Sequence, residues 1–255
     1  MVRTVKQCQV HPTHHDRLID VVLDGGFPNL PDAATIPEHL ALSFPMLVWD
    51  WERYQPDGYC PAKSEVSKSL LLQGVWESYE TVLTLDILRE PGLVIDIGAG
   101  FGWYTLLATQ TGHAVISVES DFENIRLLNL NLTMNDVGAE IHPIWIDALT
   151  PRLGVDDPVR LIKIDVEGAE DQAVRVCEPL SADYLLVEIS PILAGHYPKT
   201  VQTICGYGYR PFLIPHGDPG FGADPLGQIQ DHPLTNLDFD QADVLFIKEE
   251  LCAPS

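Results

Sequence analysis

Residues 93–102 read LVIDIGAGFG, an apolar run interrupted by Asp96 and followed by three closely spaced glycines. The run LVIDIG predicts a buried strand, and the pattern from Gly100 to Gly112 predicts the helix that follows it. Glycines at a strand-to-helix turn let a ligand approach the backbone closely. We therefore expect a ligand site at this turn.

The alternation of strand and helix continues along the chain. Apolar runs predict further strands at residues 114–120, 141–147, 160–165, 183–190, 209–214 and 243–249. Helices are expected before Pro91 and at 100–112, 169–177 and 197–206, with a long loop at 215–241. Short apolar strands that alternate with amphipathic helices are typical of α/β proteins whose parallel sheet is covered on both faces.

One further helix has a recognisable beginning. Ser120 and Glu123 have the spacing of a capping box, which predicts that the helix starts at Ser120. The residues expected to face the core along its apolar stripe are Phe122, Ile125, Leu128 and Leu132.

Composition and charge narrow the range of partners. The 255 residues include 15 basic and 37 acidic side chains, a net charge of −22. Such a charge repels polyphosphate, which argues against nucleic acid and anionic membrane surfaces as partners. Five scattered cysteines form no CxxC pair and suit a reducing compartment. No apolar run is long enough to span a bilayer, so we expect a soluble cytoplasmic protein.

The chain divides by pattern into an N-terminal extension, residues 1–70, and a main domain, residues 71–255. Seven prolines between residues 12 and 61 break any long helix in the extension. We expect it to be irregular, partly helical and laid on the main domain. Its aromatic residues, Trp49, Trp51, Tyr54 and Tyr59, either fasten it there or form a lid over a substrate. Such an extension can also exchange between the subunits of a homo-oligomer.

The turn after the first strand discriminates between two cofactor classes. A dinucleotide site uses the pattern G-x-G-x-x-G, but Trp103 occupies the position of its third glycine. Asp96 would repel a pyrophosphate and attract the ammonium group of a methionine moiety. The pattern therefore favours S-adenosylmethionine, with a nicotinamide-dependent oxidoreductase as the alternative.

Two later strands also end in carboxylates. Glu119 can accept hydrogen bonds from both ribose hydroxyls of a nucleoside, although nicotinamide cofactors use the same contact. Asp147 can accept from an adenine amino group, with Ala148 beside the ring. Because ligands of α/β sheets bind at the carboxyl ends of the strands, we expect these side chains to share one site with Asp96.

Three segments make the chain similar to the FkbM-type S-adenosylmethionine-dependent methyltransferases: VIDIGAGFGWYTLLA (94–108), VISVESDFENIRLLNLNLTMN (115–135) and LIKIDVEGAEDQAV (161–174). The resemblance implies a Rossmann-like class I methyltransferase fold with a mostly parallel seven-stranded sheet whose final strand is antiparallel. It also implies methyl transfer to a hydroxyl of a sugar or secondary metabolite. One departure is Gly100, where the family usually has asparagine.

The expected cofactor contacts combine the turn, the strand ends and the segment before the first strand, which the family resemblance places near the cofactor. They are Glu80, Asp96, Gly98, Ala99, Gly100, Phe101, Gly102, Glu119, Ser120, Asp147, Ala148 and Asp165. Glu77, in the same segment as Glu80, is expected to be solvated.

The acceptor chemistry is expected after the strand at 160–165. An alcohol acceptor must lose a proton, and Asp165 is the candidate general base or orienting group, with Glu167 beside it. Asp165, Glu167 and Glu188 could together hold Mg²⁺, while helix capping is the simpler explanation for Glu167. Lys163 is expected either to reach solvent or to pair with Asp165.

The acceptor itself is not specified by the sequence. A small molecule or glycan is the expected substrate, and the acidic charge also suits a cationic peptide or protein. A module that binds the cofactor without catalysing transfer is a further alternative, because a fold does not fix a function.

Overall fold

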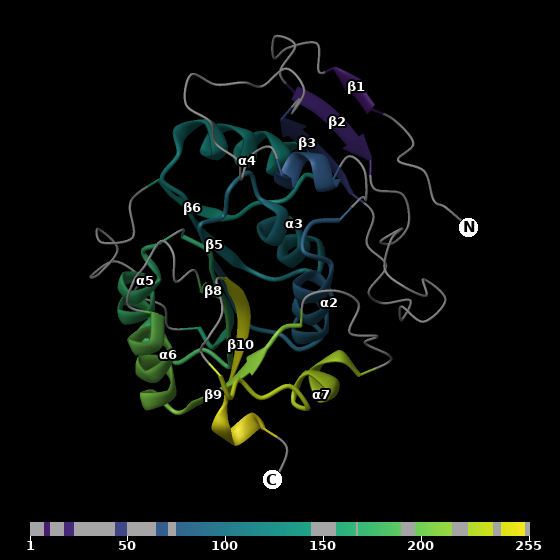
Figure 1. Ribbon diagram of the computed structural model, residues 1–255. Helices are drawn as coiled ribbons and strands as arrows, with labels where there is room; N and C mark the ends of the chain where they lie inside the picture. The colour runs from purple at the N-terminus through teal and green to yellow at the C-terminus, as the bar shows by residue number, and fades with distance from the viewer. Residues whose placement is uncertain are drawn as a thin grey trace.

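The computed structural model describes residues 8–10, 18–22, 44–49, 65–70, 75–143, 157–166, 168–189, 197–215, 224–236 and 241–252. Its main element is a seven-stranded sheet in the order β6-β5-β4-β7-β8-β10-β9 (Figure 1). The strands are β4 (Leu93–Ile97), β5 (Val115–Val118), β6 (Glu140–His142), β7 (Val159–Ile164), β8 (Tyr184–Ile189), β9 (Tyr209–Leu213) and β10 (Ala242–Lys248). Strands β4 to β8 are parallel, and β10 is antiparallel to both β8 and β9. The predicted fold class is confirmed.

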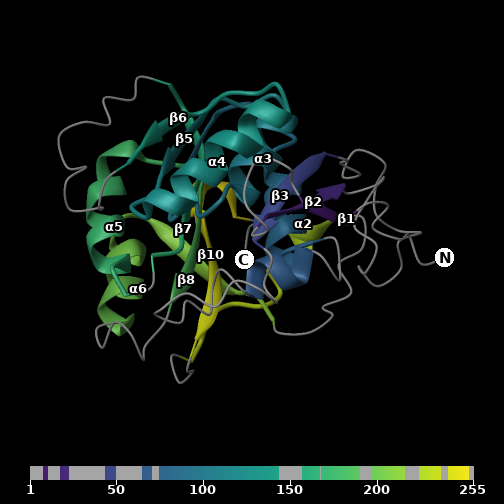
Figure 2. The same cartoon turned by 90° about the horizontal axis from the view of Figure 1, so that it is seen from above.

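Helices cover both faces of this sheet (Figures 1 and 2). The helices α5 (Glu170–Cys177) and α6 (Tyr197–Gly206) lie on one face, over a core formed by alternate strand residues such as Ile95 and Val187. On the other face lie α2 (Ser78–Ile87), α3 (Trp103–Gln110), α4 (Phe122–Met134) and α7 (Pro225–Ile229). The α7 helix corrects the expectation of an unbroken loop at 215–241.

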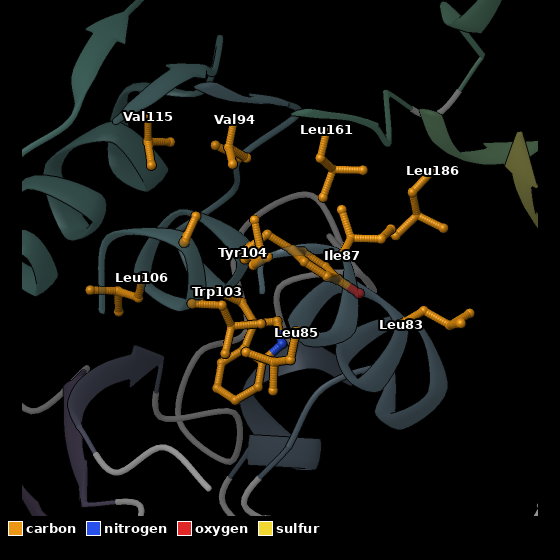
Figure 3. Packing of buried hydrophobic residues seen from close by; sticks show 14 of the residues in the cluster. Leu83, Leu85, Ile87, Val94, Trp103, Tyr104, Leu106, Val115, Leu161 and Leu186 are labelled. Carbon is orange, nitrogen blue, oxygen red and sulfur yellow. The ribbon is translucent and has the colours of Figure 1, made fainter. Parts of the chain in front are cut away.

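The second face carries the core that supports the ligand turn. Figure 3 shows Val94, Leu161 and Leu186 pointing from three adjacent strands toward Ile87 and Tyr104 on the covering helices. Because side chains alternate along a strand, Asp96 and Lys163 lie two residues further along and on this same face. On this face of the sheet, the apolar core is therefore followed directly by charged side chains.

Helix α4 does not begin as the capping box predicted. Its N-cap is Asp121, whose side chain accepts hydrogen bonds from the backbone N–H groups of Glu123 and Asn124, both at 2.9 Å. The helix starts one residue later than expected, because the Asp121 carboxylate accepts hydrogen bonds from backbone N–H groups in the first turn, which have no partner within the helix. Phe122 is consequently 77% exposed instead of facing the core, and the predicted stripe is wrong at that position.

The extension is not irregular where the structure describes it. The strands β1 (Cys8–Val10), β2 (Leu18–Val22) and β3 (Pro45–Trp49) form an antiparallel sheet in that order. Met46, Leu47 and Val48 of β3 are each 0% exposed and belong to the same apolar core as the sheet face beneath α2 and α3. Of the aromatic residues of the predicted lid, Trp49 ends β3, and Trp51, Tyr54 and Tyr59 lie outside the described residues. None of the described helices has the length and apolar character needed to cross a membrane.

Candidate functional site

The glycines of the turn after β4 serve different purposes. Gly98, Gly100 and Gly102 all have positive φ, and helix α3 begins at Trp103, three residues later than expected. A Cβ on Gly98 would overlap the backbone carbonyl oxygen of Asp165, and one on Gly102 would lie 2.5 Å from Leu128 Cδ1. A Cβ on Gly100 would meet no atom within 4 Å. Gly98 and Gly102 are therefore needed for the protein's own packing, whereas Gly100 borders open space.

Asp96 is turned into the protein behind this turn. Its side chain is 1% exposed and accepts a hydrogen bond of 2.7 Å from the Thr105 hydroxyl in the first turn of α3. Burial raises the pKa of Asp96 to about 6 despite the nearby charge of Lys163. In this position Asp96 ties α3 to β4, and its predicted contact with a methionine ammonium stays a prediction.

Glu119 joins the two ligand-side turns. Its Oε2 accepts from the N–H of Gly100 at 2.7 Å, and its Oε1 accepts from the N–H groups of Ser120 and Asp121 at 2.6 and 2.7 Å. Burial nevertheless raises the pKa of Glu119. An ionised carboxylate has about four acceptor positions; these three bonds fill three of them, and the Asn124 amide nitrogen, 3.5 Å from Oε2, faces the fourth, so a ligand hydroxyl would replace that long contact.

Asn124 lies beside this carboxylate. Its amide nitrogen is 3.5 Å from Glu119 Oε2, while its Oδ1 is buried and has no hydrogen-bond partner among the described residues. A buried acceptor without a donor is costly. A ligand hydroxyl or amino group at this point would satisfy it, a role for Asn124 that the sequence did not suggest.

Lys163 occupies the centre of a buried charged group. It is 4% exposed, and its Nζ lies 2.9 Å from Asp165 Oδ2, 3.9 Å from Glu77 Oε2 and 4.6 Å from the centre of the Tyr104 ring. The predicted pair with Asp165 is confirmed, and the alternative of a lysine that reaches solvent is wrong. Burial alone would lower the pKa of Lys163, but the charges of Asp165 and Glu77 raise it above its usual value.

Glu77 was expected in solvent, and this expectation is wrong. Its side chain is 13% exposed and accepts a hydrogen bond of 2.6 Å from the Tyr104 hydroxyl. Its backbone is left-handed, with φ 42° and ψ 71°, a conformation that costs energy for a residue other than glycine. Burial raises the pKa of the Glu77 carboxyl, and Lys163 partly offsets this increase.

A second carboxyl group from the same helix start lies deeper. Glu80 is 7% exposed, and burial together with Glu77 raises its pKa to about 7. Asp243 on β10 lies opposite Glu188 on β8, and burial and the neighbouring carboxylates raise the pKa of Asp243 well above its ordinary value. The three-residue spacing of Glu77 and Glu80 places both on one side of a helix start, and this spacing is the signal that could have identified Glu77.

The expected magnesium ligands are brought together only in part. Oxygens of Glu77, Asp165 and Glu188 lie within 4.8 Å of one another. The ammonium of Lys163 already contacts two of these three carboxylates, so the arrangement supplies a cation from the protein itself. Glu167, Asp147 and Ala148 lie outside the described residues, and their predicted roles stay predictions.

The remaining predicted turn residues are mostly backbone contributors. Ala99 and Phe101 are 7% and 4% exposed, so they offer a ligand little side-chain surface. The carbonyl oxygen of Phe101 accepts a hydrogen bond from Asn131. Ser120 contributes its N–H to Glu119.

Comparison with solved structures supports the fold. A TehB-like SAM-dependent methyltransferase from Corynebacterium glutamicum ATCC 13032 Kitasato superimposes with a TM-score of 0.50 and 10% identity, covering 73% of this chain and 95% of that one. A ribosomal protein L11 methylase from Lactobacillus delbrueckii subsp. bulgaricus gives a TM-score of 0.46 and 13% identity, with 80% and 95% covered. A precorrin-6y C5,15-methyltransferase from Geobacter metallireducens GS-15 gives 0.45 and 13%, with 65% and 86% covered.

At 10% identity, the similarity to the first of these structures concerns the fold alone. No protein-family model and no curated protein matches the sequence. The FkbM resemblance therefore stays a prediction.

Proposed function

We propose that this chain is an S-adenosylmethionine-dependent methyltransferase that methylates a hydroxyl group of a small molecule or glycan. The observation that carries the proposal is the pairing of Gly100, which borders open space, with the Glu119 carboxylate on the neighbouring strand end. An open turn beside a carboxylate suits a ribose ring, and the class I methyltransferase fold supports the assignment.

The residues present fit this cofactor. At Glu119 a ribose hydroxyl can replace the long contact with the Asn124 amide nitrogen, and Asn124 Oδ1 is a buried acceptor that needs a donor, so both can receive ribose hydroxyls. The carboxylates of Glu77 and Asp165 suit the cationic amino acid end better than the more deeply buried Asp96. When bound, S-adenosylmethionine supplies an electrophilic methyl group on a sulfonium.

The acceptor side of the proposal rests on Asp165 and its support. Lys163 fixes the Asp165 carboxylate at 2.9 Å, and this carboxylate is 24% exposed at the end of β7. Asp165 can accept a hydrogen bond from an acceptor hydroxyl, align it for in-line displacement and take up its proton as the methyl group is transferred. Lys163 supplies a positive charge beside Asp165 and Glu77, so we assign no role to a metal ion.

Two features support a small or uncharged acceptor. The net charge of −22 opposes a nucleic acid acceptor. The resemblance to the FkbM-type enzymes favours oxygen on a sugar or secondary metabolite.

Calorimetric titration with S-adenosylmethionine, S-adenosylhomocysteine and NAD tests the proposal. We expect both sulfur compounds to bind and NAD not to bind. Glu119→Ala should weaken binding of S-adenosylmethionine by about 10- to 100-fold, which is the loss of affinity expected when hydrogen bonds to a charged group are removed. Glu123→Ala is the matched control, because Glu123 is an exposed glutamate in the first turn of α4, the helix that follows Glu119. Binding of NAD alone, or of none of the three, would refute the proposal.

A further inference from the structure

Asn131 on α4 connects two segments that are far apart in the sequence. It is 0% exposed, and its Nδ2 donates to the carbonyl oxygens of Phe101, at 2.8 Å, and Leu47, at 3.1 Å. Its Oδ1 accepts from the N–H of Leu47 at 2.6 Å. Phe101 lies in the ligand turn, and Leu47 is the middle residue of β3. One amide therefore holds the turn and the N-terminal sheet at the same time.

The contact with β3 has the form of an additional strand pairing. Strand β3 lies at one edge of the order β1-β2-β3, so one of its edges has no strand partner within that sheet. Backbone groups at such an edge need partners when they are buried. The Asn131 amide provides both a donor and an acceptor for Leu47.

A second contact joins the same two segments. The ring of Phe44, which directly precedes β3, lies 5.6 Å from the ring of Trp103, the first residue of α3. Both side chains are buried, at 2% and 3% exposed. The turn between β4 and α3 is thus held by β3 on one side and by Glu119, through Gly100, on the other.

We infer that Asn131 is a positioning residue that makes strand β3 part of the ligand turn. The same Asn131 amide nitrogen donates to Phe101 in the turn and to Leu47 in β3, so a shift of either acceptor pulls the amide from its position at the other, and order in the turn and order in the strand depend on each other. A ligand that orders the turn therefore stabilises β3 in its observed position, and disorder of β3 increases disorder of the turn. Only the identity of this ligand rests on the proposed function.

Hydrogen–deuterium exchange of the ligand-free protein tests the coupling. Asn131→Asp keeps the acceptor for Leu47 but removes both donated bonds. We expect exchange at least tenfold faster in residues 44–49 and also in 98–102, with unchanged exchange in β8 and β10. Asn129→Asp is the control, because Asn129 is exposed on the same helix and bonds only locally, to Ile125.

A second variant keeps the test decisive if Asn131→Asp does not fold. Phe44→Leu removes the ring contact between Phe44 and Trp103 and should also speed hydrogen–deuterium exchange in the turn. Unchanged exchange in 98–102 in the variants that fold would overturn the inference, because Asn131 would then only fasten the strand.

The cofactor provides a separate arm of the experiment. S-adenosylmethionine should slow exchange in residues 44–49 of the wild type, although none of these residues lies in the turn. Binding without this protection counts against the coupling. Absence of binding refutes the proposed function, while the ligand-free comparison still decides the inference.

Discussion

Replacement of Lys163 by methionine tests the charged centre of the site. Methionine preserves the unbranched, apolar stem of the side chain and removes the ammonium group. In the wild type this ammonium is 2.9 Å from Asp165 and 3.9 Å from Glu77, and Lys163 is 4% exposed. The variant therefore leaves buried carboxylates without their cation.

The expected loss of stability is large. Removal of one partner from a buried ion pair costs about 3–5 kcal/mol, because the other charge stays buried and uncompensated. For a protein of this size, 1 kcal/mol corresponds to a shift of about 2–4 °C in Tm. The Lys163→Met variant should therefore melt about 6–20 °C below the wild type at pH 8.

The loss should shrink as the pH falls. Burial already raises the pKa of Asp96 to about 6, and Lys163 opposes this rise, so its removal raises that pKa further. A carboxyl group whose pKa is higher in the folded state destabilises the fold above that pKa and stops doing so as it becomes protonated. The pKa of Lys163 lies above its usual value, so the ammonium of the wild type does not titrate between pH 5 and 8.

Urea unfolding of both proteins at pH 8 and pH 5 provides the measurement. Arg175→Met is the control, because Arg175 forms a pair of similar length, 2.7 Å, with Asp171 but is 54% exposed. That exposed pair should contribute no more than about 0.5 kcal/mol. A Lys163→Met loss below about 1 kcal/mol at pH 8, or one that grows toward pH 5, would refute the assignment of Lys163 as the balancing cation.

Three further predictions concern local features of the site. Asp121→Ala should destabilise the protein by about 0.5–2 kcal/mol in urea unfolding and Ser120→Ala by much less, because Asp121 caps α4; equal losses would contradict this assignment. Gly102→Ala should cost about 1–3 kcal/mol more than Gly112→Ala, since both have positive φ but only the Gly102 Cβ meets a neighbouring side chain; equal melting temperatures would argue against tight packing at the turn. Glu80→Gln should flatten the pH dependence of stability between pH 5 and 8, because a carboxyl pKa raised to about 7 makes the wild type lose stability as the pH rises; an unchanged pH profile would exclude Glu80 as a source.

The seven strands of the main sheet were predictable because their signals are local. Continuous apolar runs such as LVIDI, bounded by glycine or proline, identify a buried strand without knowledge of its neighbours. Helix α6 was expected at residues 197–206 and is found at Tyr197–Gly206. The number of strands and the antiparallel final strand came from the family resemblance and agree with the structure.

The N-terminal sheet was missed because its segments carry little local pattern. Strands β1 and β2 have three and five residues, separated by stretches rich in proline, histidine and aspartate. Pairing between such short strands is set by contacts with the rest of the molecule, and sequence periodicity does not report those contacts. The buried side chains of β3 show that tertiary packing decides its conformation.

The amino-acid sequence by itself determined the α/β class, the turn at Gly98–Gly102 and the carboxylate at Glu119, since each depends on residues adjacent in the chain. Only the tertiary structure decided that Glu77 is buried against Tyr104, 27 positions away, and that Asn131 bonds to Leu47, 84 positions away. A polar side chain is stable inside a protein only where partners satisfy it. Those partners come from distant segments, so the burial and the role of these residues depend on the completed fold.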